Sequence, residues 1–379
     1  MAKKILCPFC FNQFDEMDIV YYCLDCGSSI KARDYTGNVS KGVKCKTETC
    51  HNREIYTKKC PTCGETLPDS LFDITSMSFS LIGSSGSGKT NYITVLLTEL
   101  SKRSRNLKFS LMPKTAETRQ TYTQNRRFIY DDKIQLSATA VGTERPSIWT
   151  ISNLNRKIMG RPLTYLLNIF DGAGETHNDL DSEAAQRDAR YIEHSEAVIF
   201  VVDPLRFTGL HQLAETIDKT KSTNSSVEGS DDENSVFVIG NTAQLIRKAL
   251  NIKTDKPIDM YVAIVISKID LFLDKCFKGT VLYSESPHAE LGYFDMNDCI
   301  AVDNEITNWL LDNGEEEFVN ALEQNFYFKK TPFHKKKCFL FGVSSFGSAP
   351  EEDYSLPQVH PHRVLDPLLW LLSQQEFID

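Results

Sequence analysis

Most of the fold follows from one stretch of the sequence, Met77-Ser78-Phe79-Ser80-Leu81-Ile82-Gly83-Ser84-Ser85-Gly86-Ser87-Gly88-Lys89-Thr90. Its first six residues are an apolar, strand-like run, and the next eight match G-x-x-x-x-G-K-[ST] in full. Apolar residues at helical spacing follow between Asn91 and Arg103. A strand, a glycine-rich loop and a helix in this order predict a loop whose backbone N–H groups wrap phosphates.

Each part of this loop has an expected role. Lys89 reaches the β and γ phosphates, and the Thr90 hydroxyl binds Mg²⁺. The residues expected to contact the phosphates are Gly83, Ser84, Ser85, Gly86, Ser87, Gly88, Lys89, Thr90 and Asn91.

A second motif follows a second apolar strand. The run from Leu163 to Phe170 ends at Asp171-Gly172-Ala173-Gly174-Glu175. We expect the Asp171 carboxylate to emerge beside the phosphates and hold Mg²⁺, usually through water, while Gly174 offers a backbone N–H to the γ phosphate. A lone D-x-x-G is a common accident, but its place after a P-loop and an apolar strand makes it informative.

Two further motifs point to the base. The run 261–266 precedes Ser267-Lys268-Ile269-Asp270, which resembles the N/T-K-x-D guanine motif with serine in the first position. Asp270 would accept hydrogen bonds from guanine N1 and N2, and the Lys268 stem would cover the base. A surface Lys-x-Asp without a role is the alternative. After the last apolar strand, 338–343, backbone N–H groups of the next loop would contact guanine O6; its residues are Ser344, Ser345 and Phe346.

Eight of the eleven cysteines lie in the first 63 residues, as three C-x-x-C pairs and one C-x4-C pair. Two such pairs close a Cys₄ zinc site, so the sequence predicts two structural zinc ions. The expected ligands are Cys7, Cys10, Cys23, Cys26, Cys45, Cys50, Cys60 and Cys63. Sequential pairing, first four and last four, is the simplest assignment, but nested or interleaved pairing fits the spacings equally well. His51 could replace one cysteine.

The whole-chain composition is that of a folded protein. The 379 residues carry 42 Lys and Arg against 51 Asp and Glu, a net charge of −9, and 41% are hydrophobic. No apolar run approaches the roughly 20 residues of a membrane-spanning helix, and the N-terminus lacks the apolar segment of an export signal. We therefore expect a cytoplasmic protein. Residues 1–64 hold ten Lys and Arg against seven Asp and Glu, which permits nucleic-acid binding there.

The predicted organisation has three parts. Residues 1–64 form a two-zinc, cysteine-rich ribbon module, 65–75 a linker and 76–379 a P-loop domain. The domain is expected to be an α/β three-layer sandwich with a mostly parallel sheet. Insertions are expected at about 104–135 and 204–259, with a flexible loop at 219–235 that has almost no apolar content.

Several segments together resemble one family. They are Phe170 to Glu175, Ala189 to Ile192, Ile199 to Leu205 and Arg363 to Leu372. With the N-terminal zinc ribbon, they resemble the second type of the bacterial double-GTPase family, within the TRAFAC class of P-loop GTPases, over nearly the whole chain. The resemblance implies a Ras-like fold, GTP and GDP as ligands with Mg²⁺, and a role in bacterial conflict or antiviral defence.

The switch residues are less defined. Thr139 and Thr143 are both candidates for the threonine that closes over Mg²⁺ when the γ phosphate is present. Glu175 stands where many small GTPases carry a water-orienting glutamine, so we expect slow unaided hydrolysis. An arginine from a partner, or Arg145, Arg187 or Arg190, would supply the missing charge.

These observations favour a regulatory GTPase that signals to a protein partner. One alternative is a zinc-ribbon module that binds nucleic acid or protein and keeps the nucleotide site only for structure. Another is a P-loop ATPase, if Ser267-Lys268-Ile269-Asp270 is a coincidence.

Overall fold

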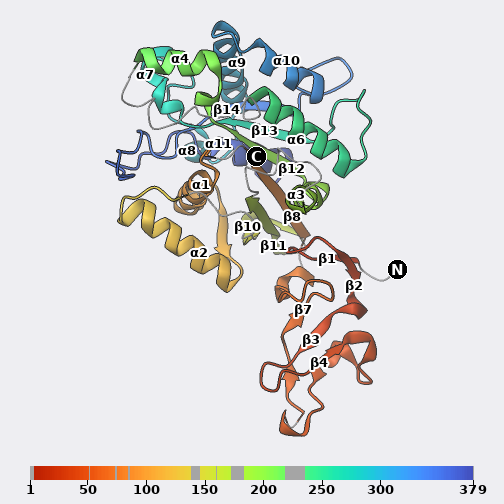
Figure 1. The fold of residues 1–379 in the computed structure, drawn as a ribbon. Helices are drawn as coiled ribbons and strands as arrows, with labels where there is room; N and C mark the ends of the chain where they lie inside the picture. Colours follow the sequence, from red (N-terminus) through yellow and green to blue (C-terminus); the bar gives the residue numbers. More distant parts are fainter. Residues whose placement is uncertain are drawn as a thin grey trace.

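The computed structural model describes residues 4–50, 52–72, 75–83, 86–137, 146–158, 160–171, 183–217 and 235–378. Figure 1 shows a small cysteine-rich part at one end and a larger α/β part above it. The expected flexible loop at 219–235 lies outside these ranges, apart from Ser235.

The larger part is built on a seven-stranded sheet in the order β14-β13-β12-β8-β11-β10-β9. Strand β10 pairs antiparallel with both β11 and β9, and the remaining neighbours pair in parallel. The strands are β8 (Thr75–Gly83), β9 (Phe109–Pro113), β10 (Ser147–Ile158), β11 (Arg161–Asp171), β12 (Ala197–Val202), β13 (Tyr261–Ile266) and β14 (Cys338–Gly342). The predicted mostly parallel sheet is confirmed.

Helices cover both faces of this sheet (Figure 1). Their bounds are α1 (Lys89–Arg103), α2 (Ala116–Arg126), α3 (Glu183–Glu193), α4 (Thr208–Ile217), α6 (Ser235–Leu250), α7 (Leu273–Cys276), α8 (His288–Leu291), α9 (Met296–Asp312), α10 (Glu316–Asn325) and α11 (Asp366–Gln374). A π-helical turn, η6 (Arg127–Asp131), extends α2.

Strand β12 shows why three layers form. All six of its residues are buried, and they alternate between two cores because successive side chains point to opposite faces. Ile199 packs with residues of α1 and α11 in one core, and Phe200 packs with residues of α6, α9 and α10 in the other. Trp370 of α11 is 1% exposed and packs against Phe339 and Phe341.

The N-terminal part is made of very short strands. A hairpin, β1 (Lys4–Leu6) and β2 (Gln13–Asp15), precedes a three-stranded sheet of β4 (Ser29–Lys31), β3 (Val20–Tyr22) and β7 (Lys58–Lys59). A second hairpin joins β5 (Val43–Lys44) and β6 (Glu54–Ile55). The buried cluster of the N-terminal part includes Cys7, Cys23, Cys45, Cys50 and Cys60. It also includes Leu67, Leu71, Ile148 and Leu166, so it continues into residues 65–72 and onto β10 and β11.

Among the described residues, no helix combines the length and the apolar character that crossing a bilayer requires.

Candidate nucleotide and zinc sites

The phosphate loop lies between β8 and α1, at the centre of the sheet. Gly83 ends β8, and a Cβ there would lie 2.3 Å from the backbone oxygen of Val201, so only glycine fits. Gly88 has φ of +85°, a conformation that glycine adopts easily. Lys89 is 8% exposed, and its Nζ donates to the Gly83 carbonyl at 2.8 Å, so the ammonium group folds back across the loop. Ser84 and Ser85 lie outside the described residues.

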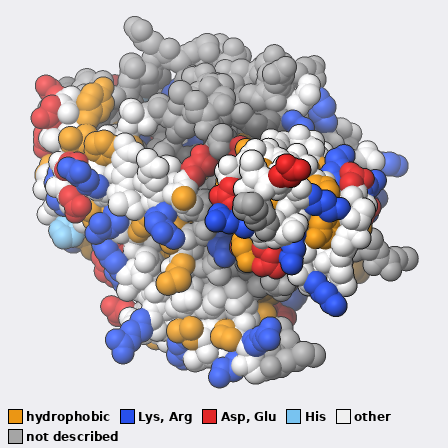
Figure 2. Space-filling model, turned by 90° about the horizontal axis from the view of Figure 1, so that it is seen from below, with side chains coloured by type: hydrophobic (Ala, Val, Ile, Leu, Met, Phe, Trp, Pro, Cys, Tyr) orange, Lys and Arg blue, Asp and Glu red, His pale blue; other side chains and the backbone are white. Residues whose placement is uncertain are grey.

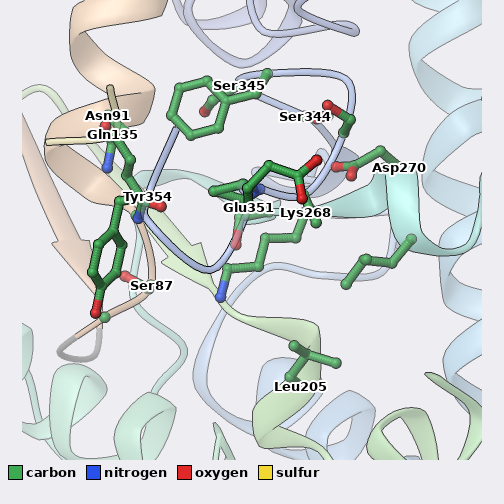
Figure 3. Close-up of a pocket in the computed structure, with 18 of the residues that line it drawn as sticks. Ser87, Asn91, Gln135, Leu205, Lys268, Asp270, Ser344, Ser345, Glu351 and Tyr354 are labelled. Carbon is green, nitrogen blue, oxygen red and sulfur yellow. The ribbon is translucent and has the colours of Figure 1, made fainter. Parts of the chain in front are cut away.

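A pocket opens beside this loop and is lined by three of the four predicted motifs (Figure 3). The P-loop helix start, the Lys-x-Asp loop and the loop after β14 contribute Gly86, Ser87, Gly88, Asn91, Ser267, Lys268, Asp270, Ser344, Ser345 and Phe346. In Figure 3, Lys268 lies between Ser87 and Asn91 on one side and Asp270 and Ser344 on the other. The motifs meet because the carboxyl ends of parallel strands share one edge of the sheet.

The fourth motif starts at the same edge. Asp171 is the last residue of β11 and pairs with Leu81 of β8, two residues before Gly83. Thr90 is the second residue of α1. Gly172, Gly174 and Glu175, together with Thr139 and Thr143, lie outside the described residues. Their expected roles, and that of the Asp171 side chain, stay predictions.

Lys268 is held in a fixed position at the base end of the pocket. Its backbone is left-handed, with φ of +51°, and its Nζ pairs with Asp203 Oδ2 at 2.6 Å. Asp203 is 3% exposed, and its Oδ1 accepts from the Leu205 N–H at 3.0 Å. The Ser267 hydroxyl donates to the Val202 carbonyl at 3.0 Å, so the serine in the asparagine position joins β13 to β12.

Asp203 is a site residue that the sequence analysis missed. The signal was present, because Asp203 directly follows the buried strand β12 just as Asp171 ends β11. The ion pair with Asp203 holds the Lys268 side chain along the pocket that it lines.

The pocket also has a wall that no motif predicted. Residues 348–352, Tyr354 and Gln135 line it. Gln135 N–H donates to the Tyr354 carbonyl at 3.0 Å, and Leu356 N–H donates to the Lys133 carbonyl at 2.8 Å. Asn91 Oδ1 accepts from the Leu136 N–H at 3.0 Å. Residues 354–356, which follow the Ser344–Phe346 loop, are therefore hydrogen-bonded to residues 133–135. Asn91 anchors the neighbouring Leu136 to α1, just before the stretch that leads to Thr139.

The eight N-terminal cysteines form two groups, and the groups are nested. Cys7, Cys10, Cys60 and Cys63 make one, and Cys23, Cys26, Cys45 and Cys50 make the other; within each, the sulfur atoms lie within 4.8 Å of one another. The sequential pairing is wrong. Strand β7 runs beside β3 and continues directly into Cys60, which carries the last pair back to the first. His51 lies outside the described residues.

The spacing of the sulfur atoms fits zinc. The Cys7–Cys63 and Cys10–Cys60 sulfur distances are both 3.8 Å, and the Cys23–Cys50 distance is 3.7 Å. A tetrahedron with Zn–S bonds of about 2.3 Å has edges of about 3.8 Å. Hydrogen bonds from the Ser28 and Thr47 hydroxyls lower the pKa of Cys26 to about 5, which favours the thiolate that zinc binds.

A third group of possible ligands, His288, Asp298 and Asp366, already surrounds a cation of the protein. The Arg363 guanidinium pairs with Asp298, and its Nε lies 3.3 Å from Asp366 Oδ2. Arg363 is 3% exposed. Burial lowers the pKa of His288 to about 4 and raises that of Asp366 to about 6. This group is a buried ion-pair cluster.

Comparison with known proteins identifies the family. The sequence model of Double-GTPase 2 matches residues 79–324, well over half of the chain. This chain belongs to the Double-GTPase 2 family. Membership of this family places the chain among the GTP-binding P-loop proteins, as the sequence predicted.

One curated relative is similar to part of this Double-GTPase 2 chain. It is the "Putative ESX-1 scaffolding and assembly protein SaeC" of Mycolicibacterium smegmatis, 29% identical over 157 residues, or 39% of this chain and 38% of the relative. The match thus spans less than two fifths of the relative's length.

Solved structures that match at low identity include a GTPase-like domain and a small GTPase. The Ski7 GTPase-like domain of S. cerevisiae bound to GTP is 13% identical, covering 80% of this chain and 50% of that one, with a TM-score of 0.30. The Arl6 BBS3 small GTPase of Trypanosoma brucei is 14% identical, covering 80% of this chain and 100% of that one, with a TM-score of 0.29.

Proposed function

We propose that this protein binds GTP with Mg²⁺ in the pocket beside the P-loop, hydrolyses it slowly and thereby controls a protein partner. The observation that carries the proposal is the convergence of the P-loop, the Lys268–Asp270 loop and the Ser344–Phe346 loop on one pocket (Figure 3). Each loop follows a parallel strand of the same sheet, so phosphates and base are bound from one edge.

The base end carries the selectivity. Asp270 lines the pocket and accepts hydrogen bonds from guanine N1 and N2, for which adenine has no matching donors. Asp203 holds Lys268 at 2.6 Å, which keeps the lysine stem extended where the base would lie on it. The backbone N–H groups of Ser345 and Phe346 would face guanine O6, whereas the Ser344 N–H already donates to the His362 carbonyl at 3.0 Å.

The phosphate end carries the chemistry. Lys89 and the P-loop N–H groups neutralise and orient the phosphates, and Thr90 and Asp171 hold the metal. Mg²⁺, when bound there, would supply neutralisation of charge on the β and γ oxygens. Thr139 or Thr143 would complete the metal site, and the Gly174 N–H would donate to the γ phosphate. Glu175 replaces the amide that usually orients water, and this carboxylate makes unaided turnover slow.

The partner is a protein rather than a nucleic acid. Figure 2 views the lower end of the molecule in Figure 1, and basic and acidic side chains are interspersed over it. Ion pairs within the N-terminal part include Lys4–Asp15, Arg33–Asp18 and Arg53–Asp25, which neutralise three of its cations. Nucleic acid favours an uninterrupted basic surface.

For the biological setting we propose a bacterial conflict or antiviral defence system, which the family resemblance supports. The mycobacterial relative's name describes a scaffolding and assembly protein, which supports a role with protein partners. Eight free, closely grouped thiols fit a reducing compartment, so we place the protein in the cytoplasm.

A phosphate-release assay with purified protein, Mg²⁺ and GTP tests this function. Lys89→Ala should lower GTP affinity by at least about a hundredfold, because a buried cation that meets phosphate contributes several kcal/mol. Lys102→Ala is the matched control, since Lys102 lies on the same helix, half exposed and paired with Glu99. Unchanged GTP binding in Lys89→Ala would place the site elsewhere.

A further inference from the structure

The first cysteine turn, residues 7–11, packs against helix α3. The Tyr191 hydroxyl donates to the Phe9 carbonyl at 2.7 Å. The Phe11 ring meets the Tyr191 ring edge-on at 4.4 Å and stacks on His194 at 5.7 Å. Tyr191 in turn stacks on Phe170, with ring centroids 3.5 Å apart. We call these contacts of Phe9 and Phe11 with Tyr191 and His194 the Phe11 contact.

Phe11 occupies a backbone position that the other C-x-x-C turns give to glycine. The residue after the second cysteine has positive φ in all three turns, +53° at Phe11, +71° at Gly27 and +74° at Gly64. Glycine adopts this conformation freely, whereas a bulky side chain is strained there. Gly27 and Gly64 are exposed, but Phe11 is 4% exposed. The strained residue is therefore the one that contacts α3.

The elements that Phe11 reaches border the proposed metal and γ-phosphate residues. Helix α3 follows the Asp171-to-Gly174 motif in the chain, and Phe170 directly precedes Asp171. A second contact lies nearby, because Ile148 and Leu166 belong to the buried cluster of the cysteine-rich part. Ile148 is the second residue of β10, which follows Thr139 and Thr143. Both contacts of the module, with α3 and with β10 and β11, therefore adjoin segments that GTPases rearrange when the γ phosphate is bound or lost.

We propose that the Phe11 contact couples the zinc module to the nucleotide, so that docking of residues 7–11 on α3 differs between the GTP-bound and GDP-bound protein. This rests on the proposed function. A coupling between two equilibria is reciprocal. If the docking equilibrium constant differs by some factor between the GTP-bound and GDP-bound protein, removing docking must change the GTP-to-GDP affinity ratio by the same factor.

Phe11→Gly is the variant that tests this coupling. It removes the ring and installs the residue that Gly27 and Gly64 show to be compatible with a cysteine turn. Leu24→Gly is the control, because Leu24 lies in the second cysteine turn and is 77% exposed. Titrations with GDP and a non-hydrolysable GTP analogue give the affinity ratio. Hydrogen exchange of residues 5–12 reports docking, and the cobalt-substituted spectrum reports intact Cys₄ sites.

In the wild-type protein, exchange of residues 5–12 should differ between the GDP and analogue complexes. Phe11→Gly should abolish that difference and shift the affinity ratio by about fivefold or more, and Leu24→Gly should change neither. If Phe11→Gly disturbs the cobalt spectrum, Tyr191→Phe serves instead, since it deletes the hydrogen bond to Phe9 and leaves the cysteine turn intact.

An affinity ratio that stays within about twofold of wild type in a variant whose residues 5–12 exchange freely overturns the coupling. A wild-type protein that binds neither GTP nor GDP overturns the proposed function instead, so the two failures are distinguishable.

Discussion

The zinc module and the P-loop domain reach a folded state by different means. The module has strands of two or three residues, and five cysteines are among the residues of its buried cluster. The P-loop domain has two extensive apolar cores on either side of a seven-stranded sheet. A small segment that buries little apolar surface depends on metal, whereas a large core does not. We therefore expect folding of the module to depend on zinc and folding of the P-loop domain to depend on its apolar cores.

Zinc removal should give the largest effect. A strong chelator should unfold residues 4–64, because structural zinc contributes about 10 kcal/mol or more to such modules. The P-loop domain should remain folded. All three tryptophans, Trp149, Trp309 and Trp370, lie in that domain, so tryptophan fluorescence follows it alone while hydrogen exchange follows the module. Simultaneous loss of the native tryptophan fluorescence and of exchange protection in the module would contradict separate folding of the two parts.

The nested pairing can be tested in the same way. Cys60→Ser should expose Cys7 and Cys10 to alkylation and leave Cys23 and Cys26 protected. Cys276→Ser, outside both groups, is the control. Exposure of Cys45 and Cys50 instead would support the sequential pairing.

The second effect belongs to the P-loop domain alone. Asp270→Asn should weaken GTP binding by roughly tenfold to a hundredfold and favour xanthosine triphosphate, because the amide donates where the carboxylate accepted. Asp274→Asn is the matched control, since Asp274 lies on the adjacent helix α7 and bonds Tyr283 at an exposed position. Competition titrations with the two nucleotides measure the shift. An unchanged preference would refute the base assignment.

The smallest effect concerns how the P-loop domain responds to pH. His288 has a pKa lowered to about 4, so the unfolded chain binds its proton first and stability rises with pH between about 4 and 6.5. Asp366 has a pKa raised to about 6, so the folded state keeps a proton and stability falls between about 4 and 6. The two contributions oppose each other.

Variants separate these two contributions. Between about pH 4 and 6, the unfolding free energy of Asp366→Asn minus that of wild type should rise with pH. The same difference for His288→Gln should fall with pH, each by roughly 1 kcal/mol per pH unit. Urea unfolding followed by tryptophan fluorescence measures both. Slopes of the same sign in the two variants would contradict this assignment.

The sequence predicted what depends on local pattern. The P-loop and the Lys268–Asp270 loop each follow an apolar run that predicts a parallel strand, so their position at one edge of the sheet could be inferred. Pairings between distant segments could not be inferred, because C-x-x-C spacing is identical for sequential and nested arrangements. The contacts of Asp203 with Lys268, of Gln135 with Tyr354 and of Phe11 with Tyr191 depend on the same long-range packing, to which no local motif points.

The most direct test of the account is calorimetric titration of the Mg²⁺-supplemented, nucleotide-free protein with GTP, GDP and ATP. The pocket that joins P-loop residues Gly86 to Gly88 to Asp270 predicts binding of GTP and GDP and at least about a hundredfold weaker binding of ATP, because adenine offers Asp270 no donors that match guanine N1 and N2. Equal or tighter binding of ATP, or no binding of any of the three, would contradict it.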